Sequence, residues 1–140
     1  MNRPIKFRVW DKITNQYLQE LGIYYWHIPY SLDGEEITGE ANLVGLSELL
    51  KHDNFVTQQY TGLNDSNDNP IYEGDILMYK SGSIPTTGVI GQVLYEADEG
   101  GYIFQWERKG PNQHHINLNC DVAFESVIIG NIFEHSELLK

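Results

Sequence analysis

The predicted strands are organised around the stretch Gln59–Ile76, QYTGLNDSNDNPIYEGDI. It overlaps a β-prone segment over residues 55–60, and its middle, residues 62–69, is rich in the Gly, Asn and Asp residues that form turns. Residues 70–72 begin a return strand, which residues 76–79 continue. The stretch therefore predicts strands that meet across a polar turn.

Further strands are predicted downstream of this turn. The β-prone segments there are residues 88–95 (GVIGQVLY), 101–107 (GYIFQWE) and 127–133 (VIIGNIF). The first two are joined by an acidic hairpin loop at residues 96–100, and five short strands are expected after residue 72. Gly91 and Gly130 lie inside strands, where glycine marks the bends or bulges that a small barrel needs. We therefore expect an SH3-like barrel at approximately residues 70–134.

The N-terminal part of the chain is expected to supply β-hairpin elements and one short helix. Residues 5–10 have the period-two pattern of a strand with one buried face, and residues 17–20 can return as its partner. Residues 23–28 are strongly β-prone, whereas residues 31–42 are polar and acidic and indicate an exposed loop. Residues 43–52 carry apolar side chains at spacings of three and four, which predicts the helix.

Length and composition favour one mainly β domain. The 140 residues suit a single domain, so we expect residues 1–140 to form one unit with its own core. No internal repeat or linker divides the chain. Cys120 is the only cysteine, which rules out an intrachain disulfide. The N-terminus lacks the apolar segment of a signal peptide, and no apolar run has the length of a membrane span, so we expect a cytoplasmic protein and no membrane association.

The net charge of −11 bears on the choice of partner. Residues 1–30 carry four basic and two acidic groups, whereas residues 31–140 carry five basic and 18 acidic groups. Because affinity for nucleic acids depends on Lys and Arg contacts to phosphates, direct binding of DNA or RNA is not expected. The acidic surface either keeps the protein soluble or meets a basic partner.

Residues 65–69, DSNDN, superficially resemble the start of a calcium-binding loop. An EF-hand loop needs glycine at its sixth position and glutamate at its twelfth, but counting from Asp65 these positions are Pro70 and Ile76. The sequence therefore favours a polar turn, in which Asn and Asp side chains accept hydrogen bonds from their own backbone.

The segment Tyr72-Glu73-Gly74-Asp75-Ile76 has two interpretations. Glu73 and Asp75 are a formal acid/base pair, but no third group near them in the sequence tunes their protonation. Alternatively, Gly74 supplies a positive φ and Asp75 accepts backbone N–H bonds at the entry to a strand. We favour the structural interpretation.

The remaining chemically active side chains form no recognisable site. The five histidines, which lack metal-ligand spacing, are His27, His52, His114, His115 and His135. On a strand, the adjacent His114 and His115 would point to opposite faces. Cys120 is expected to be a small buried residue, and the tryptophans Trp10, Trp26 and Trp106 are expected to pack in cores or interfaces. We therefore expect no catalytic, metal or cofactor-binding residues.

Residues in and around the stretch 59–77 also resemble a known family. Gln59–Asp65 (QYTGLND) and Pro70–Leu77 (PIYEGDIL) are similar to the signature of the YopX family, small proteins associated with phages and prophages. Residues 5–11 (IKFRVWD) and 127–139 (VIIGNIFEHSELL) agree with the family's two ends. The departures are Asp68-Asn69, where a glycine-containing turn is common, and Phe133, where tyrosine often lies. The resemblance implies a mainly β fold with an SH3-like barrel and a phage or prophage gene, and it implies no activity.

Three functions are compatible with these observations. The first is a non-enzymatic phage accessory protein that binds a host or phage protein. The second is an acidic DNA mimic that inhibits a nucleic-acid enzyme, with carboxylates in rows at roughly phosphate spacing. The third is a small hydrolase that uses Glu73, Asp75 and a histidine in one pocket. Homo-oligomerisation is also open, because the aromatic N-terminal segment could cover a sheet edge of another copy.

Overall fold

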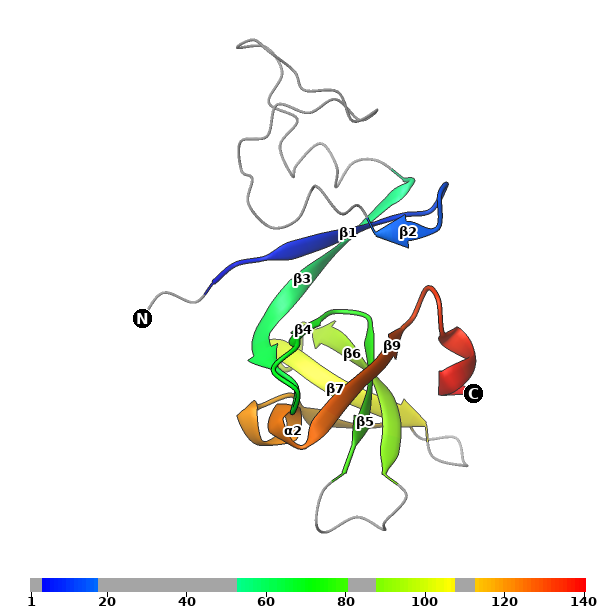
Figure 1. The fold of residues 1–140 in the computed structure, drawn as a ribbon. Coiled ribbons are helices and arrows are strands. Elements are labelled where there is room, and N and C mark those ends of the chain that lie inside the picture. The colour runs from blue at the N-terminus through cyan, green and yellow to red at the C-terminus, as the bar shows by residue number, and fades with distance from the viewer. Residues whose placement is uncertain (1–3, 18–52, 81–87, 108–112) are drawn as a thin grey trace. The chain divides into compact units, whose positions relative to one another are not determined.

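Strands dominate the part of the chain that the computed structural model describes, which comprises residues 4–17, 53–80, 88–107 and 113–140 (Figure 1). The strands are β1 (Phe7–Asp11), β2 (Gln16–Tyr17), β3 (Phe55–Asn64), β4 (Pro70–Tyr72), β5 (Asp75–Tyr79), β6 (Val89–Glu96), β7 (Gly101–Glu107), β8 (Gln113–Asn117) and β9 (Ser126–Asn131). The helical elements of these residues are the short helix α2 (Cys120–Phe124) and the 3-10 turn η1 (Ser136–Leu139). The mainly β class predicted from the sequence is confirmed. The predicted helix at residues 43–52, the strand at 23–28 and the loop at 31–42 lie outside the described residues.

By its internal contacts the chain divides into two units, Ile5–Gln59 and Tyr60–Lys140, the second of which also includes residues 1–4. We describe each unit by itself. The expectation that residues 1–140 form one domain stays a prediction.

The first unit contains the predicted N-terminal hairpin. β1 pairs antiparallel with β2, where Trp10 lies opposite Tyr17, and with the first half of β3, from Phe7 opposite Gln59 to Asp11 opposite Phe55. Trp10 is buried, and its indole meets the Tyr17 ring edge-on at 4.9 Å between centroids. The predicted packing role of Trp10 is thus confirmed.

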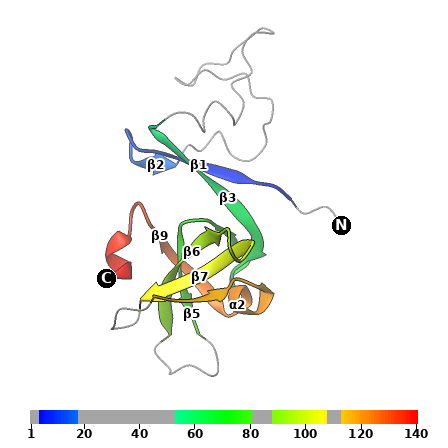
Figure 2. The same cartoon turned by 180° about the vertical axis from the view of Figure 1, so that it is seen from behind.

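The second unit is a five-stranded antiparallel sheet in the order β8-β7-β6-β5-β9. Figures 1 and 2 show from opposite sides how these strands curl into a half-barrel, as the SH3-like prediction requires. The predicted strands at 88–95, 101–107 and 127–133 correspond to β6, β7 and β9. The predicted turn over residues 62–69 is too long, because β3 continues to Asn64, which lies opposite Pro70 of β4.

The second unit has a hydrophobic core between the sheet and α2. Its buried side chains are Ile71, Leu77, Val93, Phe104, Leu118, Val122 and Ala123. Leu77, Val93 and Phe104 lie on successive strands, and α2 contributes Val122 and Ala123. A Cβ on Gly91 would lie 2.3 Å from the Gln105 carbonyl oxygen, and one on Gly130 would lie 2.7 Å from the His135 ring, so both positions require glycine. These close approaches agree with the predicted bends.

Within the described residues, no helix has the length and apolar character needed to cross a membrane.

Candidate functional site

The Asp65 turn (residues 65–69) occupies the place of the apparent calcium loop. One carboxylate oxygen of Asp65, Oδ1, accepts hydrogen bonds from the N–H groups of Asn67 and Asn69, both at 2.9 Å. Two backbone hydrogen bonds also close the turn. The Asp65 N–H donates to the Asn69 carbonyl, and the Asp68 N–H donates to the Asp65 carbonyl. Asp65 is 4% exposed. Its carboxylate therefore acts as a turn cap, as the sequence favoured, and not as an exposed cation ligand.

The same turn covers one edge of the barrel sheet. The second oxygen of Asp65, Oδ2, accepts the Ile128 N–H of β9 at 3.0 Å, and the Ser66 N–H donates to the Ser126 carbonyl at 2.9 Å. These groups lie on the outer side of β9, the last strand of the sheet. Asp65 and Ser66 thus supply the hydrogen bonds that a further strand would otherwise make. This edge contact was not predicted from the sequence.

Asp75 has the structural role that the sequence favoured. It is 2% exposed, and its Oδ2 accepts the Tyr72 N–H at 2.8 Å across the turn between β4 and β5. Gly74 has a φ of 77°, which a residue with a side chain rarely adopts. Its N–H donates to the Val93 carbonyl, and its carbonyl accepts the Ile132 N–H. The Asp75 carboxylate is therefore fixed inside a turn, whereas Glu73 is half-buried.

The described histidines occupy separate environments. His114 stacks on Trp106 at 5.9 Å, whereas the exposed His115 faces Glu99, so the two adjacent rings point to opposite faces as predicted. His135 accepts the Asn131 N–H through Nδ1 at 3.3 Å. His27 and His52 lie outside the described residues. In the part of the chain that the structure describes, no group of three metal-ligating side chains occurs.

Cys120 is exposed at the start of α2, so the expectation that it is buried is wrong. The five-residue helix directs Val122 and Ala123 into the core, and Cys120 lies two residues earlier on the side that faces solvent. Trp106 packs against the core and stacks on Phe104 at 5.5 Å, which confirms its predicted packing role. Trp26 lies outside the described residues.

Asp11 closes the hairpin of the first unit. Its Oδ1 accepts the Ile13 N–H at 2.8 Å and its Oδ2 accepts the Thr14 hydroxyl at 2.9 Å. The hydrogen bond from Ile13 holds the pKa of Asp11 below its usual value of 3.8, and the bond from Thr14 acts in the same direction, while partial burial opposes both. This carboxylate stabilises the turn between β1 and β2.

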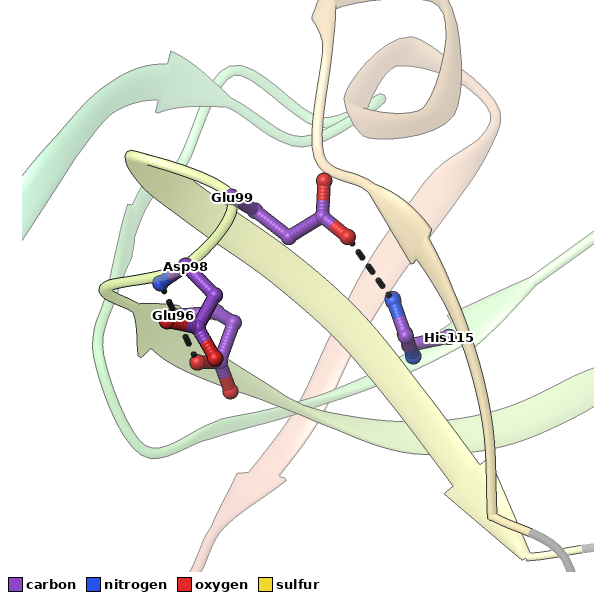
Figure 3. A network of polar contacts seen from close by, with 4 residues as sticks. All are labelled: Glu96, Asp98, Glu99 and His115. Atoms are coloured by element: carbon purple, nitrogen blue, oxygen red, sulfur yellow. Dashed lines mark hydrogen bonds and ion pairs between the residues drawn. The ribbon is translucent and has the colours of Figure 1, made fainter.

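An acidic hairpin joins β6 to β7 and reaches towards β8. Its carboxylates belong to Glu96, Asp98 and Glu99, the last two exposed. Figure 3 shows Glu99 directed at His115, with Oε1 3.4 Å from Nε2, while the Asp98 N–H donates to Glu96 Oε1 at 3.4 Å. Both partners of the Glu99–His115 pair are 43% exposed, so the pair contributes little to stability. The sequence predicted the acidic loop but not its proximity to β8.

The architecture defines a mainly β protein with a curled, five-stranded antiparallel sheet. A crystal structure of protein EF1440 from Enterococcus faecalis is similar to this chain, with a TM-score of 0.55 and 24% sequence identity over 97% of this chain and 98% of that chain. At this identity the likeness concerns the fold alone. Among curated proteins, no relative matches the sequence.

The family is established by a different comparison. The YopX protein family matches residues 6–140, nearly the whole chain, and the chain therefore belongs to this family. The resemblance noted from residues 59–77 is confirmed.

Proposed function

We propose that this chain is a non-enzymatic protein-binding module of a phage or prophage, which acts in the cytoplasm of the host cell and binds a host or phage protein through a basic surface of that partner. The phage setting rests on membership of the YopX family. The observation that carries the binding role is a set of exposed acidic side chains that lack a Lys or Arg partner among the described residues of the second unit.

These carboxylates are exposed and, in the described part of the chain, have no Lys or Arg partner; they belong to Asp98, Glu99, Asp121, Glu125 and Glu137. The described lysines of the same unit are Lys80 and Lys140, both exposed. An uncompensated surface of one sign attracts partners of the opposite sign and accelerates their association.

Two alternatives compete with this proposal. A hydrolase built on Glu73 and Asp75 is disfavoured, because the Asp75 carboxylate is 2% exposed and accepts a backbone hydrogen bond. An acidic DNA mimic would carry its carboxylates in rows at roughly phosphate spacing, and its partner would be a nucleic-acid enzyme that DNA displaces.

Capture from a host lysate tests the proposal. The tagged chain is compared with the variant Glu96→Gln/Asp98→Asn/Glu99→Gln, and retained proteins are identified by mass spectrometry at low and high salt. We expect a specific protein that the wild-type chain retains, that the variant retains less and that high salt releases. Failure to retain any protein above background, across several hosts, would contradict the proposal. Release of the captured protein by added DNA would favour the mimic.

A further inference from the structure

The two edges of the barrel sheet differ. At β9 the Asp65 turn occupies the edge, with Ser66 N–H on the Ser126 carbonyl and Asp65 Oδ2 on the Ile128 N–H. At the opposite edge, no strand of the described residues pairs with the outer side of β8. Because an open strand edge is a template for pairing with another chain, proteins usually cover it.

The hydrogen-bond pattern shows which groups of β8 point outward. Leu118 N–H donates to the Tyr102 carbonyl, so this pair is a hydrogen-bonded one. In an antiparallel ladder such pairs alternate with non-bonded pairs, and the register places Ile116 opposite Phe104 and His114 opposite Trp106. The backbone groups of His114 and Ile116 therefore face β7.

The same alternation directs the remaining backbone groups of β8 away from the sheet. Those groups belong to Gln113, His115 and Asn117, and no partner for them occurs in the part of the chain that the structure describes. We define them as the β8 edge. A strand added there would find N–H and C=O groups at the two-residue spacing that antiparallel pairing needs.

Among the described residues, the charged side chains around the β8 edge are acidic, while Arg108 and Lys109, which precede β8 in the sequence, lie outside the described residues. Glu99 reaches His115 from the neighbouring hairpin, which also carries Glu96 and Asp98 (Figure 3). Asp121, in the α2 helix that follows β8, is exposed as well. An incoming segment that carries lysine or arginine would therefore meet carboxylates of opposite charge, whereas an acidic segment would be repelled.

We infer that the β8 edge binds an extended, basic segment of a partner protein, which adds to the half-barrel as a further antiparallel or parallel strand. Backbone hydrogen bonds to His115 and Asn117 fix the segment, and the carboxylates of the β6–β7 hairpin select its charge. This inference rests on the proposed protein-binding function and names the surface and the chemistry of the partner.

The probe is a short, end-capped peptide in which lysine alternates with valine. It is titrated into the full chain, and amide shifts and amide hydrogen exchange are followed residue by residue by NMR. In the free chain we expect slow exchange at His114 and Ile116 and fast exchange at His115 and Asn117. The peptide should then slow exchange at His115 and Asn117 and shift the signals of β8. Control peptides carry glutamate in place of lysine, or N-methyl groups that remove their own N–H donors, and neither should bind.

Three variants keep the test specific. Asn117→Pro removes an outward N–H and should leave the fold intact while weakening peptide binding by roughly 2- to 10-fold. Ile116→Pro removes an inward N–H and should disrupt pairing with β7. Glu99→Gln should weaken binding of the lysine peptide, because it removes a carboxylate that faces His115.

Three results would overturn the inference. The first is an absence of peptide effects on β8, and the second is equal effects of the lysine and glutamate peptides. The third is concentration-dependent protection of His115 and Asn117 without peptide, which would identify a second copy of the chain as the occupant. If β8 does not respond but lysate capture retains a specific protein, the inference fails and the proposed function stands.

Discussion

The Asp65 carboxylate accepts the Ile128 N–H at 3.0 Å although the two residues are 63 positions apart in the sequence. The same carboxylate accepts two N–H groups of its own turn. One buried side chain therefore fixes the local turn and joins it to the edge of the barrel sheet. This double role explains why residues 65–69 are rich in Asn and Asp without matching a calcium-binding loop.

Asp65→Ala should destabilise the second unit strongly. The substitution leaves three backbone N–H groups without their acceptor, and we expect a loss of about 3 kcal/mol in the free energy of unfolding. Urea-induced unfolding measures this loss. The matched control is Asp98→Ala, which removes an exposed carboxylate and should change stability by less than about 0.5 kcal/mol. Equal effects of the two substitutions would show that Asp65 is not a structural cap.

Gly130→Ala should displace His135. A Cβ at this position would lie 2.7 Å from the imidazole ring, so the ring must move and its hydrogen bond with the Asn131 N–H must weaken. We expect a loss of roughly 1–3 kcal/mol in the wild-type background. The cost should be smaller in a His135→Ala background, and a double-mutant cycle measures the difference. A cost that does not depend on residue 135 would contradict the contact.

Asp11 should make stability depend on pH in the acid range. The folded-state pKa of Asp11 lies below its usual 3.8, so this carboxylate contributes stability that is fully present above the unfolded-state pKa. That contribution is lost as the pH falls through the folded-state pKa. The stability difference between wild type and Asp11→Asn should therefore shrink below about pH 4. The control substitution is Asp53→Asn, at an exposed aspartate of the same unit. A stability difference between wild type and Asp11→Asn that stays constant with pH would refute the role of Asp11.

Cys120 should react with a thiol reagent in the folded protein. Because its side chain is exposed at the start of α2, labelling needs no unfolding step and its rate should not change with low concentrations of denaturant. Cys120→Ser should alter the unfolding free energy by less than about 0.5 kcal/mol. Labelling that proceeds only after unfolding would mean that the thiol is covered.

Local patterns predicted much of the fold. The alternation and turn residues around Gly88–Tyr95 and Gly101–Glu107 predicted strands that the structure has as β6 and β7, because each carries buried residues on one face and is bounded by turn formers. The sequence did not predict β8 or α2. The β8 sequence, QHHIN, has weak apolar alternation, and α2 depends on the Asn119 side chain that accepts the Val122 N–H and on burial of Val122 and Ala123.

The contacts that define the candidate surfaces could not be predicted from the sequence. Asp65 and Ile128 are 63 positions apart and meet only through the tertiary arrangement of the half-barrel, and Glu99 reaches His115 because the β6–β7 hairpin lies beside β8. Residue spacing along the chain contains no signal for either contact. The turn roles of Asp65 and Asp75, in contrast, depend on hydrogen bonds to near neighbours in the sequence, and these roles were predicted.

The affinity of the purified chain for the protein that it captures is the direct measure of binding through the acidic side chains. The dissociation constant is measured at two salt concentrations for wild type and for Glu96→Gln/Asp98→Asn/Glu99→Gln. We expect a specific complex with wild type that is weakened both by salt and by the substitutions. A complex whose affinity is independent of both, or the absence of any specific complex, would contradict this expectation.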